Sequence, residues 1–232
     1  MKRLLALALA AAPAAIATVA LTAPAVPALA LEEPVNAPAA KRVAKEGSGL
    51  KTAIFAGGCF WGVEGVFSHV KGVKSAVSGY HGGSAATAKY DVITSGGTSH
   101  AESVRITYDP YVIRYDELLR IFFSVVADPT LLNRQGPDIG AHYRVALVPT
   151  NAEQRAVAQA YLKQMEASRV WKKPIVAKIE PARTFYPAES YHQDFMAKNP
   201  NHGYIRRWDK PKVDALRVMF PRDFKPAFLR DG

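Results

Sequence analysis

One stretch, residues 51–62 with the sequence KTAIFAGGCFWG, decides how the rest of the chain is interpreted. Its apolar part, residues 53–56, predicts a buried strand, and the glycines that follow allow a sharp turn. Apolar residues then recur at positions 63, 66, 67 and 70, the spacing of an amphipathic helix. We expect Cys59 in the first helical turn, where free N–H groups and the helix dipole stabilise a thiolate. Cys59 is therefore interpreted as a reactive cysteine, with a buried packing cysteine as the alternative.

The first 30 residues have the organisation of an export signal. Lys2 and Arg3 form a short basic region, an Ala/Leu-rich run follows, and residues 28–30 match an A-x-A cleavage site. We predict a signal peptide over residues 1–30, export to the bacterial periplasm, and no stable membrane insertion after cleavage. An uncleaved anchor is the alternative, because the apolar run is nearly long enough to span a bilayer. Residues 31–50 lack periodicity and are predicted to be a flexible linker.

The composition excludes several classes of protein. The 232-residue chain carries a formal net charge of +10, yet it has no nucleic-acid recognition motif, so we expect no nucleic-acid partner. Its one cysteine cannot form a disulfide within the chain. An odd cysteine in an exported protein indicates a reactive thiol. The six histidines lack the spacing of metal ligands, and we predict no metal and no cofactor.

Strand and helix patterns alternate from residue 51 onward. Strands are expected over residues 51–56, 73–80, 101–108, 142–148 and 175–179, and helices over residues 59–70, 115–126, 151–167 and 188–198. This order predicts an α/β or α+β sandwich with helices packed on a sheet. Residues 200–232, rich in Arg, Lys and Pro, are predicted to be a basic, irregular C-terminal tail.

Glu102 is the candidate acid for chemistry at Cys59. It falls on the apolar side of the strand predicted for residues 101–108, where desolvation would raise the pKa of its carboxyl and keep it protonated. A surface glutamate on an edge strand is the alternative. Phe60 and Trp61 are candidates for the wall of an apolar pocket, although such a pair also fits a place in the core.

Several motifs resemble those of the type A peptide methionine sulfoxide reductases, a family that reverses methionine oxidation. The motif GCFWG at residues 58–62 is similar to the active-site motif of that family, and similar blocks follow in order at residues 79–83, 90, 97–110, 134–144 and 189–195. The resemblance covers residues 51–199, which we take as the reductase domain. It implies an α+β fold: a ferredoxin-like α/β sandwich with a mixed sheet and helices packed on it.

The resemblance also implies roles for individual residues. Cys59 would attack the sulfoxide sulfur and become a sulfenic acid, while Glu102 would protonate the departing oxygen. The remaining site residues would be Tyr90 and Tyr143, which bind that oxygen, Phe60 and Trp61, which hold the substrate methyl group, and Asp138, which orients the site. The substrate would be methionine S-sulfoxide, free or within oxidised proteins, and we expect a monomer that repairs such proteins.

Two positions depart from the pattern of the family. Many members carry resolving cysteines in the C-terminal segment, often shortly after a Gly-Tyr pair, but here Gly203 and Tyr204 are followed by Ile205 and no cysteine exists downstream. An external thiol must therefore reduce the sulfenic acid, and a thioredoxin-like protein or a small thiol would serve. His142 stands where a glutamine is more usual, which affects fine contacts only.

Two other function classes remain open from the residues alone. A cysteine hydrolase would pair Cys59 with His81 or His100 as the base. A non-catalytic binding protein would use the aromatic residues after Cys59 to hold methionine-rich segments, and it would need no acid at position 102.

Overall fold

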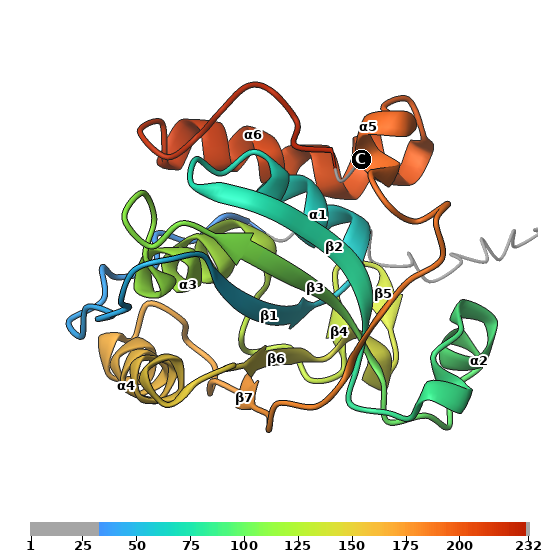
Figure 1. Cartoon of the computed structure of the whole chain (residues 1–232), viewed down its shortest axis with the longest axis horizontal. Coiled ribbons are helices and arrows are strands. Elements are labelled where there is room, and N and C mark those ends of the chain that lie inside the picture. The colour runs from blue at the N-terminus through green and yellow to red at the C-terminus, as the bar shows by residue number, and fades with distance from the viewer. Residues whose placement is uncertain (1–32, 231–232) are drawn as a thin grey trace, which may run out of the picture.

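The computed structural model describes residues 33–230, and its centre is a six-stranded sheet (Figure 1). The strand order is β7-β6-β1-β3-β2-β8. The bounds are β1 Lys51–Gly57, β2 Val73–His81, β3 Ala101–Tyr108, β6 Val145–Val148, β7 Lys178–Ile179 and β8 Phe185–Pro187. Neighbouring strands are antiparallel, except that β6 and β7 are parallel. The sheet is therefore mixed.

Helices pack on this sheet and on one another. Their bounds are α1 Phe60–Ser68, α2 Tyr90–Thr94, α3 Tyr115–Ile121, α4 Ala152–Ser168, α5 Phe195–Lys198 and α6 Lys210–Met219. A short ribbon of β4 (Arg134–Gln135) and β5 (Asp138–Ile139) stands beside the main sheet. Helix α1 contacts strands of the sheet and also α5 and α6, so it lies between the sheet and the C-terminal segment (Figure 1). The predicted α+β fold with helices on a mixed sheet is confirmed.

An aromatic cluster fixes α1 against the sheet. Phe55 of β1 is fully buried, and its ring lies 5.6 Å from that of Phe67, 5.9 Å from that of Tyr115 and 5.0 Å from that of Phe122. These rings join β1, the last turn of α1, the start of α3 and the π-helical turn that follows α3. Burying a side chain of this size contributes about 1.5–3 kcal/mol. Phe60, the first residue of α1, is buried as well, so the core holds the turn that carries Cys59 at both of its ends.

The segment before β1 differs from the expected flexible linker. Over residues 33–50 it has no helix or strand, yet it packs on the domain: Ala37 and Ala44 are buried, and the Ala44 amide donates to Asp116 at 2.9 Å. The Glu46 carboxylate accepts from the Tyr115 amide at 3.0 Å and from the Tyr108 hydroxyl. The linker prediction is wrong for residues 33–50, because specific polar contacts hold a segment whose composition has no periodicity.

The C-terminal segment also differs from expectation. A π-helical turn, Ile205–Asp209, leads directly into α6, and Pro211 lies in the first turn of that helix, where its missing N–H costs nothing. Leu216 is fully buried. The prediction of an irregular tail is wrong over residues 205–219, because a run rich in Arg and Lys still presents an apolar side to α1.

Two other elements are shorter than predicted. The helix predicted for residues 188–198 begins only at Phe195, and the strand predicted for residues 175–179 is confined to Lys178–Ile179. The signal peptide predicted for residues 1–30 lies outside the described residues. Within residues 33–230 every helix is too short or too polar to cross a membrane.

Candidate active site

Cys59 lies at the junction between β1 and α1, as the residue that caps the helix rather than in its first turn. Gly58 has a φ of +85°, and a Cβ there would lie 2.6 Å from Gln135, so only glycine fits this turn. The Cys59 side chain is buried, with 8% of its surface exposed. The Trp61 amide stabilises the thiolate by a hydrogen bond. The sharp turn predicted from the paired glycines is confirmed.

The prediction of an acidic Cys59 thiol is wrong for this resting site. Burial raises the pKa of the thiol well above its usual value, and the carboxylates of Asp209, Glu102 and Asp138 raise it further. The hydrogen bond from the Trp61 amide lowers the pKa but does not offset these effects. Cys59 is therefore a thiol at neutral pH, and it needs a proton acceptor when it reacts.

Glu102 is a buried carboxyl on β3, next to the start of α1. Only 1% of its surface is exposed, and its Oε2 accepts the Phe60 amide at 3.0 Å. Burial raises its pKa to about 8, with smaller contributions from Asp138 and Asp209, while the Phe60 hydrogen bond lowers it. The carboxyl is thus protonated near neutral pH, as the alternation of β3 predicted. The alternative of a surface glutamate is wrong.

Tyr90 and Tyr143 lie on separate elements that reach the same site. Tyr90 begins α2, where its amide donates to Glu189 at 3.0 Å, and burial raises the pKa of its hydroxyl to about 12. Tyr143 ends a 3-10 turn, and burial also raises its pKa. Each hydroxyl interacts electrostatically with Glu102 and Cys59. Both therefore remain neutral donors around the thiol at physiological pH.

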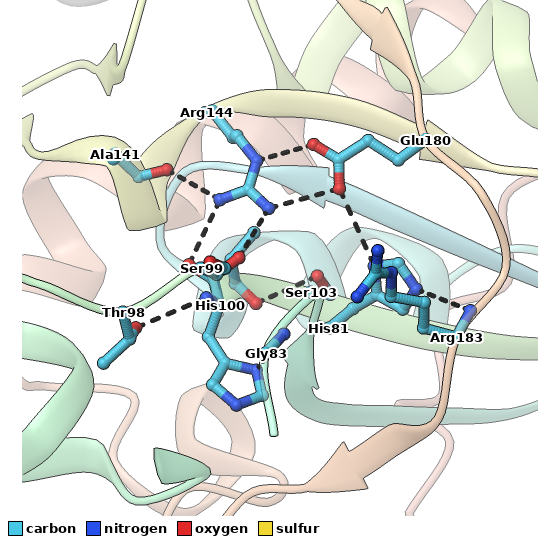
Figure 2. A network of polar contacts seen from close by, with 11 residues as sticks. His81, Gly83, Thr98, Ser99, His100, Ser103, Ala141, Arg144, Glu180 and Arg183 are labelled. Atoms are coloured by element: carbon cyan, nitrogen blue, oxygen red, sulfur yellow. Dashed lines mark hydrogen bonds and ion pairs between the residues drawn. The ribbon is translucent and has the colours of Figure 1, made fainter. Parts of the chain in front are cut away.

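Arg144 fixes the turn that carries Tyr143 (Figure 2). Its guanidinium donates to the carbonyl oxygens of Ser99 at 3.0 Å, His100 at 3.1 Å and Ala141 at 3.0 Å. It also binds Glu180 with both carboxylate oxygens, at 2.7 Å and 3.2 Å. Residues 99 and 100 immediately precede β3. Arg144 therefore holds the Tyr143 turn against the end of the strand that carries the buried acid.

The two aromatic residues after Cys59 have different surroundings. Phe60 is almost fully buried and packs in the core, with its ring 4.9 Å from that of His192. Trp61 is only partly buried, stacks on Phe195 with ring centres 3.7 Å apart, and lies at right angles to Tyr204. Its indole N–H donates to His192 Nδ1 at 3.0 Å. Trp61 is thus the more accessible wall of the site.

Asp138 lies on β5 and is joined to residues that the sequence reasoning did not include. The Tyr204 hydroxyl donates to its carboxylate, and this bond lowers a pKa that burial raises. Asp209, at the end of the π-helical turn, is fully buried, and Lys212 of α6 lies 3.8 Å from it. A signal for this region was available at Gly62, since a glycine inside a helix indicates close approach of another group.

The histidines proposed as bases for a hydrolase are engaged elsewhere. His100 is buried, and its ring contacts the Gly83 amide at 3.2 Å and the Ser84 carbonyl at 2.9 Å. His81 accepts the Arg183 amide at 3.1 Å through Nε2 (Figure 2). Neither ring is placed to activate Cys59. No group of three or more His, Cys, Asp or Glu side chains among residues 33–230 could hold a metal ion.

The comparison with protein families agrees with this geometry. The family model for peptide methionine sulfoxide reductase matches residues 51–223. The chain belongs to the peptide methionine sulfoxide reductase family. It is 52% identical over 177 residues to peptide methionine sulfoxide reductase MsrA 2 of Mesorhizobium japonicum, covering 76% of this chain and 91% of that relative. It is 47% identical over 174 residues to MsrA of Deinococcus radiodurans, covering 75% and 84%.

Solved structures of methionine sulfoxide reductases share the fold. The reduced form of Mxr1 from Saccharomyces cerevisiae matches with a TM-score of 0.59 at 32% identity, covering 69% of this chain and 92% of that one. Methionine sulfoxide reductase A of Corynebacterium diphtheriae matches with a TM-score of 0.55 at 30% identity, covering 66% and 76%. The chain is therefore an oxidoreductase that reduces methionine sulfoxide and acts in protein repair.

Proposed function

We propose that this methionine sulfoxide reductase acts on the S-sulfoxide of methionine, free and within proteins, through a sulfenic acid on Cys59. The observation that carries this proposal is the neutral Glu102 carboxyl, bound to the amide of the residue after Cys59. A sulfoxide oxygen leaves only when protonated, so the reaction needs a buried acid beside the attacking sulfur. Glu102 meets that requirement.

The other site residues fit supporting roles in this reaction. The neutral hydroxyls of Tyr90 and Tyr143 would donate to the sulfoxide oxygen, and Trp61 would contact the substrate methyl group. Asp138 would orient Tyr204 through their hydrogen bond. Phe60 would support this wall from the core instead of touching much of the substrate, because it is almost fully buried.

A cavity beside the site gives protein-bound substrate room. It has a volume of about 410 Å³, and its lining includes Asp138, Tyr204, Trp171 and Trp208. Aromatic and apolar walls with a few polar groups are typical of ligand pockets. The residues that flank an oxidised methionine in a peptide could lie in this cavity, so we propose that protein-bound sulfoxide is the main substrate.

The chemistry is tested by a single turnover without reductant. Purified enzyme mixed with methionine S-sulfoxide should release one equivalent of methionine, and a sulfenic-acid reagent should then label Cys59. The variant C59S should release none. Methionine formed by C59S at the wild-type rate would reject the assignment, and repetition with the R-sulfoxide tests the stereochemistry.

We propose that a thioredoxin-like protein or a small thiol completes each cycle. Two reducing equivalents are needed: the first thiol attacks the Cys59 sulfur and releases water, and the second resolves the mixed disulfide. The test mixes oxidised enzyme with a thioredoxin whose second cysteine is replaced by serine, and with glutathione. A stable adduct through Cys59 identifies the donor. If neither reductant supports turnover, both are rejected.

We propose that the enzyme is exported to the periplasm after removal of residues 1–30. The basic start, apolar run and A-x-A site support this location. N-terminal sequencing of the protein recovered from the periplasm should begin at Leu31. Full-length protein retained in the membrane fraction would instead support the anchor, and analytical ultracentrifugation of the mature form tests the expected monomer.

A further inference from the structure

Asp209 is a buried carboxylate that the proposed reaction has not yet used. It is fully buried, and within the described residues neither of its oxygens accepts a hydrogen bond. The nearest cation is Lys212, whose Nζ lies 3.8 Å from Oδ1, beyond hydrogen-bond distance. Burying a charged group without hydrogen bonds is costly, so such groups occur where function requires them. Asp209 also ends a π-helical turn, a conformation frequent at functional sites.

The position of Asp209 relates it directly to the Cys59 motif. A Cβ built on Gly62, the last residue of GCFWG, would lie 2.2 Å from Asp209 Oδ1 and 2.8 Å from its Cγ. Gly62 therefore leaves the space that the carboxylate fills, one helical turn after the reactive cysteine. Among the charged groups that raise the pKa of the Cys59 thiol, the Asp209 carboxylate contributes most. The charged and titratable groups that interact with Asp209 are Cys59, Glu102, Asp138, Tyr204 and Lys212.

The reaction requires two protons on one oxygen, and Glu102 supplies only one of them. When the Cys59 thiolate attacks, an S–S bond forms and Glu102 protonates the sulfoxide oxygen. The S–O bond then breaks, and a second proton is needed for that oxygen to leave as water. A water molecule next attacks the Cys59 sulfur, the S–S electron pair reduces the substrate to methionine, and the released proton returns to Glu102. The sulfoxide sulfur gains two electrons, and the cysteine sulfur loses two.

We propose that Asp209 accepts the proton of the Cys59 thiol as the S–S bond forms, and delivers it to the sulfoxide oxygen as the second proton. This inference rests on the proposed sulfenic acid mechanism and adds one residue to it. Asp209 takes up this proton and then gives it away, so it ends the reaction ionised, as it began. A base is needed because Cys59 is a thiol in the resting site. Asp209 is the buried carboxylate that lies against the Cys59 motif at Gly62, and within residues 33–230 neither of its oxygens makes a hydrogen bond that would have to break before it takes up a proton.

This assignment predicts a bell-shaped pH profile for the single turnover. Asp209 must be ionised to accept a proton, and burial raises its pKa to about 7. Glu102 must be protonated to donate one, and its pKa is about 8. The rate should therefore rise with pH around 7 and fall around 8, with apparent values that belong to the coupled pair.

The decisive experiment compares D209N with D214N. Asp214 is a half-exposed residue of the adjoining helix, paired with Lys210, and serves as the matched control. D209N should release methionine at least tenfold more slowly in a single turnover at pH 7.5 and should lose the rising limb of the profile. Its Cys59 should nevertheless be alkylated faster by iodoacetamide at that pH, because removal of the negative charge favours the thiolate. D214N should behave as wild type in both assays.

A slower reaction with a more reactive thiol is a result that a merely structural role would not produce. A D209N turnover within twofold of wild type, or a rising limb that survives in D209N, would overturn the proposal. If D209N does not fold, E102Q answers the question: its residual activity should keep the rising limb near pH 7 and lose the falling one, and a flat profile would overturn the proposal. If the proposal about Asp209 is rejected, the proposed function still stands provided that C59S is inactive and E102Q is slow.

Discussion

Two walls of the candidate active site lie near Cys59, and each carries a buried carboxyl held in a different way. The sheet wall is Glu102 of β3 together with the Phe60 amide that binds it at 3.0 Å. The C-terminal wall is Tyr204, Asp209 and Lys212, where Asp209 has no hydrogen bond and only a cation 3.8 Å away. Burial raises the pKa of both carboxyls, to about 8 for Glu102 and about 7 for Asp209.

The two walls differ in the interaction that stabilises the ionised form of the buried carboxyl. A single backbone hydrogen bond stabilises ionised Glu102, whereas Lys212 stabilises ionised Asp209 through its charge. At neutral pH the first carboxyl is therefore mainly protonated and the second shared between its two forms. Two acids in similar burial thus reach different protonation states, which is the arrangement expected of an acid and a base that act on one substrate.

The largest effect is expected from breaking the sheet wall with E102Q. The amide keeps the size of the side chain but cannot donate a proton in the same way, so the single-turnover rate should fall by roughly 10²–10⁴-fold. The thermal midpoint should change little, because the Phe60 amide retains an acceptor. Stopped-flow release of methionine measures the rate. A non-catalytic binding protein would bind the sulfoxide but show no turnover. Turnover by the wild-type enzyme in the same assay therefore excludes that class.

The C-terminal wall is tested by G62A. A methyl group at position 62 would lie 2.2 Å from Oδ1 of the fully buried Asp209, so the free energy of unfolding should fall by about 1–3 kcal/mol. The single turnover should also slow, since the carboxylate is displaced. Chemical denaturation measures the first effect.

G65A is the matched control for G62A. A Cβ at Gly65 of the same helix would meet the end of the Met196 side chain at 2.3 Å, and that flexible side chain can move. Both substitutions gain the same helix propensity from alanine. Equal stability and equal turnover in the two variants would show that Asp209 does not pack against Gly62 closely enough to exclude a methyl group.

The two walls also differ in how far sequence reasoning reached. Glu102 was found because strand alternation is local: residue 102 shares a face with Val104 and Ile106, and all three are buried. Asp209 could not be found in that way, because its place depends on how α6 packs on α1, more than 140 residues away along the chain. The one local trace was Gly62, a costly residue inside a helix.

The same reason explains the errors about Cys59 and residues 33–50. The helix start at Cys59 was visible in the sequence, but the burial and the three carboxylates that raise the pKa of its thiol come from distant segments. Residues 33–50 have no periodicity, and their order depends on single contacts such as Glu46 with Tyr115. Local pattern therefore located the elements and Cys59, while tertiary contacts determined the protonation state of its thiol.

A smaller effect is expected when the sheet wall is loosened indirectly, through R144K. Lysine cannot reproduce the fork that binds Glu180 with two oxygens and three backbone carbonyls at once (Figure 2). The turn that carries Tyr143 should shift relative to β3, and the turnover should fall about tenfold with less change in stability. Arg42, half-exposed and paired with Glu153, provides the control R42K. A loss of stability without a loss of rate would mean that Arg144 supports the fold and not the site.

The smallest effect is expected from Y204F, which removes one hydroxyl from the C-terminal wall. The Tyr204 hydroxyl donates to Asp138 and lowers the pKa of that carboxyl. Without it Asp138 should take up a proton at higher pH, and the single-turnover rate should fall a few-fold, for a hydrogen bond worth about 1 kcal/mol. Y111F, at a tyrosine that is 77% exposed, is the control. Because the proposal assigns the proton transfer to Asp209, the effects of D209N and Y204F should differ in size and in the limb of the pH profile that each changes. A Y204F effect as large as that of D209N would instead make Asp138 and Tyr204 the controlling pair of that wall.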